Sequence, residues 1–187
     1  MAEHVFPFPK STIPAGGEFG NKTAPRTIAH RGVDFAVAGG TPIKAATSGV
    51  VTVSKWNTVL GNVVVVQDPK GVYWGYCHLR DAGIAVGKPV VAGVTVIGKV
   101  GNTGTASRGA HLHFTCSAEP EGYSHGKVVD PIAGLEKRIA AEKPKAAPAV
   151  PAAPVTPAEA PEAAVEAPVA PKKPAVKKAP AIAPKAE

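Results

Sequence analysis

Residues 62–79 have the sequence NVVVVQDPKGVYWGYCHL, and this stretch is the strongest indication of the fold. Two runs rich in Val, Tyr and Trp flank residues 67–71, where Asp, Pro and Gly are typical of a tight chain reversal. This stretch predicts a β-hairpin. Similar Val/Ile/Thr/Tyr-rich runs recur about every 8–12 residues between residues 33 and 117, and Gly, Pro or Asn separates them. The spacing predicts an all-β protein with an antiparallel sheet, and it argues against alternating strands and helices.

Together with the hairpin, the flanking segments predict seven strands in a two-layer flattened sandwich with a central cleft. The expected strands lie near residues 33–37, 43–46, 49–56, 62–68, 72–79, 94–100 and 111–117. Beyond them, apolar residues at helical spacing follow Asp130 and Pro131. Because Asp is a preferred N-cap and Pro is favoured at the first helical position, we expect one short helix over residues 131–142.

The composition divides the chain into unlike parts. The chain has 187 residues, and all 20 glycines lie before residue 141, whereas 11 of the 20 prolines lie from residue 141 onward. We therefore expect an irregular lead-in over residues 1–27 that packs on the domain, one folded domain over residues 28–140, and a disordered Ala/Pro/Lys-rich tail over residues 141–187. One domain of that size has an ample core, whereas two would not.

Charge and apolar content exclude several classes of protein. The net charge of +7 and a pI near 9.5 favour polyanionic partners, among them nucleic acid, anionic lipid and bacterial wall polymers. No stretch approaches the roughly 18–20 apolar residues of a spanning helix, so we expect no membrane insertion. The first ten residues lack the basic and apolar regions of a signal peptide, so we expect synthesis in the cytoplasm without Sec export. Cys77 and Cys116 are then expected to be reduced thiols.

Three histidine-containing segments carry the chemistry. His30 and Asp34 are four residues apart, a spacing of roughly 13 Å on an ideal strand, so a shared metal would require a bend, which we place at Gly32. His111 and His113 alternate with apolar residues and so share one face of a strand. Each of these motifs, taken alone, also fits an ordinary surface pair.

The strand over residues 72–79 supplies the third segment. By the same alternation, Trp74, Tyr76 and His78 lie on one face, which favours Trp74 and Tyr76 as cleft walls. Cys77 and Cys116 are expected to point away from the histidine faces as small buried hydrophobes. Three nitrogen or oxygen donors leave one position open on a tetrahedral Zn²⁺, which is the composition of a hydrolytic zinc site.

Taken together, the three segments resemble the motif set of a known enzyme family. The segments His30–Asp34, Tyr76–Leu79 and Gly109–Phe114 have the order of the HxxxD, YxHL and HLHF motifs of lysostaphin-type, or LytM-like, zinc endopeptidases, which cut peptidoglycan peptides. The resemblance covers roughly residues 16–135. It implies that Zn²⁺ is the cofactor, that His30, Asp34 and His113 are the metal ligands, and that His78 and His111 are the catalytic pair.

Three positions depart from the pattern of this family. Cys77, Thr115 and Ala110 stand where the family usually has a small residue, an acidic residue and a proline. None of them removes a ligand or a catalytic histidine. We therefore expect an active, monomeric peptidase whose partner is bacterial peptidoglycan, with anionic wall polymers as further partners of the basic tail.

Two other classes remain as alternatives. One is a binding module of the biotinyl or lipoyl barrel type, which the Gly-rich turns over residues 87–104 resemble, although no lysine-bearing hairpin tip is present. The other is a nucleic-acid-binding protein, but the tail has no arginine or aromatic residue for base contacts, so we expect no nucleic-acid partner. A wall hydrolase without a signal peptide fits a phage endolysin or virion-associated lysin, which would reach the wall after phage lysis or as part of a virion.

Overall fold

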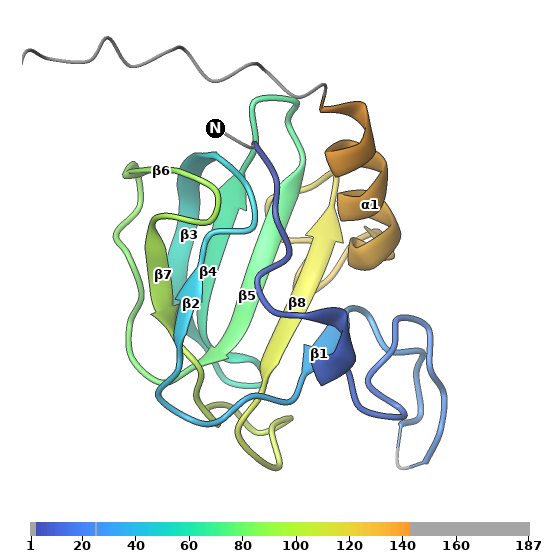
Figure 1. Ribbon diagram of the computed structural model, residues 1–187. Helices are drawn as coiled ribbons and strands as arrows, with labels where there is room; N and C mark the ends of the chain where they lie inside the picture. Colours follow the sequence, from blue (N-terminus) through green and yellow to red (C-terminus); the bar gives the residue numbers. More distant parts are fainter. Residues whose placement is uncertain (1–2, 25, 143–187) are drawn as a thin grey trace, which may run out of the picture. The chain divides into compact units, whose positions relative to one another are not determined.

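The computed structural model describes residues 3–24 and 26–142, and the chain in these ranges forms a β-sheet protein with one α-helix (Figure 1). The elements in chain order are the 3₁₀ helix η1 (Lys10–Thr12), the strands β1 (Val33–Phe35), β2 (Pro42–Lys44), β3 (Gly49–Asn57), β4 (Gly61–Gln67), β5 (Tyr73–Leu79), β6 (Pro89–Val90), β7 (Val96–Lys99), β8 (Leu112–Ser117) and β9 (Val128–Val129), and the helix α1 (Pro131–Ala141). Residues 143–187 of the expected tail lie outside the described residues.

The strands form a seven-stranded sheet and a separate two-stranded sheet. The order in the large sheet is β1-β8-β5-β4-β3-β6, with β9 also paired to β8, while β2 pairs with β7. Every strand pairing among the described residues is antiparallel. The all-β antiparallel fold with one short helix after the strands is therefore confirmed. Within the described ranges, no helix has the length and apolar character needed to cross a membrane.

The expected elements are present with small differences at their ends. The β4–β5 hairpin turns where expected, closed by hydrogen bonds from the Asp68 amide to the Val72 carbonyl (2.8 Å) and from the Gly71 amide to the Asp68 carbonyl (3.0 Å). The helix begins at Pro131, and the Asp130 side chain accepts hydrogen bonds from the two following free amides, as expected of an N-cap. The strands β6 and β9 were not predicted, because a strand of two residues is too short to show an alternating pattern.

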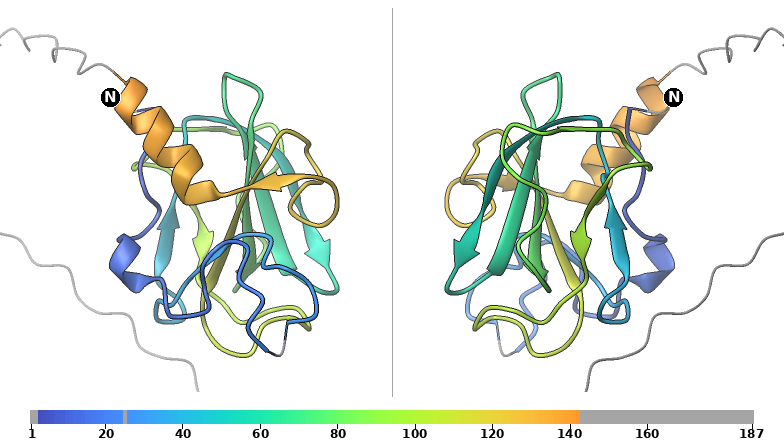
Figure 2. Two further views of the ribbon diagram at one scale, coloured as in Figure 1. Left: turned by 90° about the vertical axis from the view of Figure 1, so that its right-hand side faces the viewer. Right: turned by 90° about the vertical axis from the view of Figure 1, so that its left-hand side faces the viewer.

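The main core lies on one face of the large sheet. Edge-on views place the start of the lead-in with η1, the β2–β7 pair and α1 on that side (Figure 2). The core joins Ile43 of β2, Ile97 of β7 and Leu135 of α1 to the large aromatic side chains of β5 and β8. A second, smaller cluster lies on the other face of the sheet and consists of Val53, Val63, Val65, Cys77 and Tyr123.

The prediction that Trp74 and Tyr76 line a cleft is wrong. Both side chains are fully buried in the main core, where Trp74 stacks on Phe114 with ring centroids 5.7 Å apart. Their polar atoms have internal partners: the Trp74 indole donates to Asp68 (3.2 Å), and the Tyr76 hydroxyl accepts from the Ala46 amide (2.7 Å). These residues therefore hold the layers together and do not contact substrate.

The described part of the lead-in packs against the main core through Phe6, Phe8, Ile13 and Phe19. Near its start, the buried His4 bridges two distant carboxylates, with 2.6 Å from Nδ1 to Glu142 and 3.5 Å from Nε2 to Asp68. His4 thus ties the lead-in to the end of α1 and to the β4–β5 turn. The rest of the lead-in then continues to the edge strand β1.

Candidate metal centre

Three of the predicted site residues meet at the edge of the large sheet. Asp34 in β1 lies directly opposite His113 in β8, so the strand register itself places their side chains together. Asp34 Oδ1 is 2.9 Å from His113 Nδ1 and 3.2 Å from His30 Nε2, and the two imidazole nitrogens are 3.1 Å apart. Within the described ranges these three residues form a group whose ligand atoms all lie within 4.8 Å of one another.

The HxxxD motif closes because the chain bends between its two ends, at Gly32 as expected. The residues before the bend are fixed by backbone hydrogen bonds from the His30 amide to Asn21 (2.9 Å) and from the Gly20 amide to His30 (2.8 Å). A side chain at Gly32 would collide with the His113 ring and the Phe114 carbonyl. Glycine is therefore needed for the close approach of this bend to β8.

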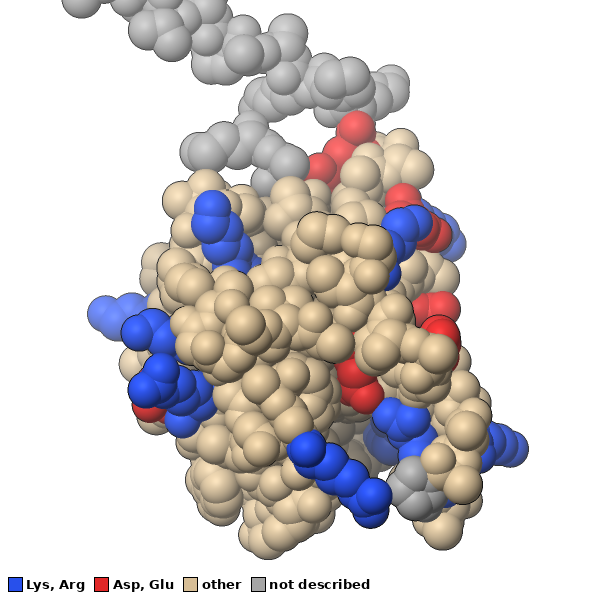
Figure 3. Space-filling model, turned by 60° about the horizontal axis from the view of Figure 1, so that its bottom comes forward, with Lys and Arg blue, Asp and Glu red and all other residues tan. Residues whose placement is uncertain are grey.

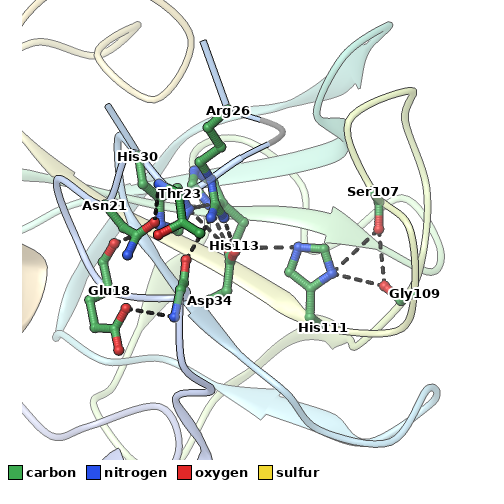
Figure 4. Close-up of polar contacts among 11 residues, drawn as sticks. Glu18, Asn21, Thr23, Arg26, His30, Asp34, Ser107, Gly109, His111 and His113 are labelled. Carbon is green, nitrogen blue, oxygen red and sulfur yellow. Dashed lines mark hydrogen bonds and ion pairs between the residues drawn. The ribbon is translucent and has the colours of Figure 1, made fainter. Parts of the chain in front are cut away.

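The remaining polar atoms of these residues are held by neighbours, as Figure 4 shows. His30 Nδ1 lies 2.9 Å from the Glu18 carbonyl, which can only accept, so Nδ1 carries the proton and the Nε2 lone pair points at Asp34. The other Asp34 oxygen, Oδ2, accepts a hydrogen bond from Arg26 (2.9 Å), whose second amine donates to the Gly16 carbonyl (2.6 Å). Such outer contacts are typical of metal-ligating residues.

This donor set fits a zinc ion. Two imidazole nitrogens and one carboxylate oxygen converge within about 3 Å, and electron pairs facing one another at that distance favour a cation between them. Three protein donors leave a fourth position of a tetrahedron open, which is the arrangement of a catalytic zinc site and not of a closed structural one.

The protonation states suit metal binding. Burial raises the pKa of Asp34, but the close contacts with the His113 and His30 rings outweigh burial and hold that pKa well below its usual range. Burial lowers the pKa of His113, against the opposing effect of Asp34. The cluster therefore offers an ionised carboxylate and a neutral imidazole at neutral pH, and these are the forms that bind a metal.

His78 and His111 lie beside this cluster without joining it. Their rings are 4.7 Å apart between centroids, and His111 Nε2 is 3.7 Å from Asp34 Oδ1. In each ring Nδ1 faces a backbone carbonyl, that of Thr103 for His78 (2.7 Å) and that of Gly109 for His111 (2.8 Å). With the proton on Nδ1, the Nε2 atom of His78 is the free base, and burial lowers the pKa of His78 to about 4.

The route by which His78 reaches this face differs from the predicted alternation. Leu79 pairs with Asn62 and Tyr76 with Val64, so Cys77 and His78 together oppose the single residue Val63. This is a β-bulge, and His78 adopts a left-handed backbone conformation (φ 61°) within it. The extra residue shifts the alternation by one, so that His78 leaves the face of Tyr76 and joins the face of His113.

The same bulge corrects the prediction for one cysteine. Cys77 pairs directly with His113 and therefore lies on the histidine face, contrary to the expectation that both cysteines point away from it. Cys116 does point away, into the main core. Both are free thiols, and Cys77 is fully buried; burial and the nearby Asp34 charge raise its pKa. Cys77 is a packing residue and is absent from the three-residue ligand group.

A cleft with a volume of about 400 Å³ opens beside the cluster. His30 and His113 lie at its base, and the walls come from the segment around residues 26–31, the β3–β4 turn, Ala106 and the loop carrying Tyr123 and Ser124. Figure 3 shows this end of the sheet coming forward, with acidic atoms recessed between uncharged walls and basic side chains beside them. No sequence pattern marks the cleft-lining roles of Arg26, Arg31 or Tyr123, because these residues lie in irregular segments.

Comparisons with known proteins agree with this geometry. The model of a family described as Peptidase family M23 matches residues 28–131. The DD-carboxypeptidase/endopeptidase Mpg of Neisseria meningitidis serogroup B is 38% identical over 103 residues, which make up 55% of this chain and 22% of Mpg. The chain thus spans about a fifth of the length of that relative.

Solved structures share the fold as well. The catalytic domain of the antimicrobial peptidase lysostaphin from Staphylococcus simulans is 31% identical, with a TM-score of 0.56 over 64% of this chain and 89% of that chain. A zinc-containing peptidase from Vibrio cholerae is 26% identical, with a TM-score of 0.54 over 69% of this chain and 41% of that chain.

Proposed function

The chain belongs to peptidase family M23, and from this membership we propose that it is a zinc-dependent endopeptidase that hydrolyses peptide bonds of bacterial peptidoglycan. The resemblance drawn from the three histidine motifs is confirmed by the family match. One observation carries the proposal: two histidines that are outside the ligand group flank a three-donor metal cluster at the base of an open cleft.

The residues of this chain would divide the work in a simple way. His30, Asp34 and His113 would hold the metal, with Glu18 and Arg26 fixing the orientation of two of them. When bound, zinc supplies a Lewis acid that polarises the scissile carbonyl and acidifies water.

The proton transfers would fall to His111 and His78. His111 Nε2 lies 3.7 Å from Asp34 Oδ1, close enough to the cluster to take a proton from an attacking water. His78 is neutral at physiological pH and is held by Thr103, so its Nε2 can share a proton with the substrate nitrogen or its oxygen. The cleft walls would align the peptide strand over the ligand histidines His30 and His113.

Histidine variants separate metal binding from catalysis. We expect His113→Ala to lose both zinc and hydrolysis, and we expect His78→Ala and His111→Ala to keep zinc while hydrolysis falls by about 10²–10⁴-fold. Zinc content is measured by mass spectrometry, and hydrolysis by the turbidity loss of purified cell walls. The exposed His125 provides the matched control, since His125→Ala should change neither. Stoichiometric zinc in His113→Ala, or full lysis by both other variants, would overturn the proposal.

The biological setting is a further proposal. We propose that the protein is a phage lysin, monomeric, which is made in the cytoplasm and meets the wall after release or within a virion. Its expression in a bacterial cytoplasm should then leave cells intact until a holin is co-expressed. Lysis without a holin would reject this route while leaving the peptidase activity untouched.

A further inference from the structure

Arg31 follows the ligand His30 directly, and its side chain lines the cleft. One guanidinium amine, Nη2, donates to two backbone carbonyls of the opposite loop, those of Gly122 (3.0 Å) and Gly126 (2.9 Å). The guanidinium is therefore fixed in position across the cleft wall. Its other terminal amine, Nη1, has no hydrogen-bond partner in the part of the chain that the structure describes.

The positive charge of Arg31 also lacks a counter-ion. The other cleft arginine, Arg26, is paired with Asp34 at 2.9 Å, but among the described residues no carboxylate lies within ion-pair distance of Arg31. Its Nε atom is buried without a partner, so part of the guanidinium has already lost its water. Among the described residues, the lining of the cleft includes no Asp or Glu, and the carboxylate of Asp34, behind His30 and His113, is already paired with Arg26. A partly buried, preordered cation in such a cleft favours an anionic ligand.

We propose that Arg31 is a specificity-determining residue that binds a free carboxylate of the substrate next to the scissile bond. This inference rests on the proposed function. In a cross-link to diaminopimelate, the amide nitrogen that is cut is attached to a carbon that carries a free carboxylate, as in a D-alanyl-diaminopimelate bond. An oligoglycine bridge has no such group beside its amides. Arg31 therefore selects carboxylate-bearing cross-links over glycine bridges.

Arg31 also fixes the loop that contains Gly122 and Gly126, so the experiment must separate carboxylate binding from loop support. Two cross-linked stem peptides serve as substrates: both contain the D-alanyl-diaminopimelate amide, and they differ only in whether the adjacent carboxylate is free or amidated. We expect the wild-type protein to favour the free carboxylate by about 10- to 100-fold in kcat/KM, as is typical of a hydrogen bond between charged groups.

In Arg31→Met this preference should fall to within about twofold, and Arg31→Lys should restore part of it because the charge returns without the planar geometry. Loss of loop support alone would lower both rates together and leave their ratio unchanged, which would overturn the inference. The exposed Arg80 lies outside the cleft, and Arg80→Met is the control expected to keep the wild-type ratio.

A binding measurement on zinc-free protein keeps this test separate from the proposed activity. Titration with D-alanyl-meso-diaminopimelic acid should shift the Nε–H resonance of Arg31 in a proton–nitrogen correlation spectrum, and the amidated dipeptide should not. If the wild-type protein cleaves no wall substrate but shows this shift, the proposed function fails and the carboxylate site stands. Equal cleavage of both stem peptides, or no shift with the free acid, refutes the carboxylate site alone.

Discussion

A single methyl group at Gly32 tests whether the metal cluster depends on the bend before β1. The Cβ atom of Gly32→Ala would lie 2.8 Å from His113 Cε1 and 3.0 Å from His113 Nε2, and it would overlap the Phe114 carbonyl oxygen. Carbon atoms pack at about 3.5 Å or more, so the His113 ring must move by about 0.7 Å. The Phe114 carbonyl belongs to the central part of β8 and cannot yield as readily.

This displacement is large on the scale that metal binding allows. Metal–ligand distances tolerate deviations of about 0.2 Å, so a shift of about 0.7 Å exceeds the tolerance more than threefold. We expect the zinc affinity of Gly32→Ala to fall by about 100-fold or more. Overpacking should also lower the free energy of unfolding by about 1–3 kcal/mol, even without zinc.

Zinc affinity is measured by competition with a chelator, and stability by thermal unfolding with the chelator in excess. Gly39→Ala is the matched control, because its Cβ would meet only the Ala110 side chain at 3.5 Å, an ordinary contact. That variant should keep the wild-type zinc affinity and change the stability by less than about 1 kcal/mol. Wild-type zinc affinity in Gly32→Ala would show that the bend does not position His113.

Three further changes probe the surroundings of the site. Arg26→Met should weaken zinc binding by about 10- to 100-fold, because Asp34 Oδ2 loses its hydrogen-bond donor; an unchanged affinity in chelator competition would exclude this role. Burial lowers the pKa of His78 to about 4, so the unfolded chain takes up a proton at His78 at a higher pH than the folded chain does. The free energy of unfolding of the zinc-free protein should therefore fall by up to about 3 kcal/mol between pH 6.5 and pH 4. Denaturant titrations should show a smaller loss for His78→Asn, which tolerates a left-handed backbone; an identical pH dependence would contradict the assignment. Deleting residues 143–187 should leave the thermal midpoint of the domain unchanged and weaken wall binding only at low salt, where the Debye length is about 30 Å at 0.01 M against 8 Å at 0.15 M; binding that is unaltered at every salt concentration would remove any electrostatic role of the tail.

The strands could be predicted from the sequence because they are rich in residues that favour β-structure and are separated by clear turn residues. The four consecutive valines of β4 and the Asp-Pro-Lys-Gly turn after them leave little alternative to a hairpin, and alternation along β8 assigns the faces of His113 and Phe114 correctly. Pairing of β1 with β8 is a long-range event, and no local pattern encodes it. The register between Asp34 and His113 therefore had to come from the structure.

The sequence also could not supply the contacts made by irregular segments. Arg26, which holds Asp34, and the carbonyl of Glu18, which orients His30, lie in the lead-in, where neither period nor turn chemistry marks them. A backbone carbonyl leaves no trace in the residue type. The metal cluster was thus predictable in its ligands only through the resemblance of ordered motifs, and its supporting shell was not predictable at all.

The bulge at His78 explains why regular alternation failed in β5 and why the site needs that failure. In an unbroken strand, His78 would share the face of Tyr76, which packs in the main core on the side away from His113. His78 is the one non-glycine residue with a positive φ among the described residues, a conformation that costs about 1 kcal/mol or more. Hydrogen bonds from its amide to the Leu60 carbonyl (2.8 Å) and from its ring to the Thr103 carbonyl (2.7 Å) offset that cost. The β3–β4 turn and the loop that carries Thr103 therefore hold His78 beside His111, and the local strain lies where the chemistry is expected.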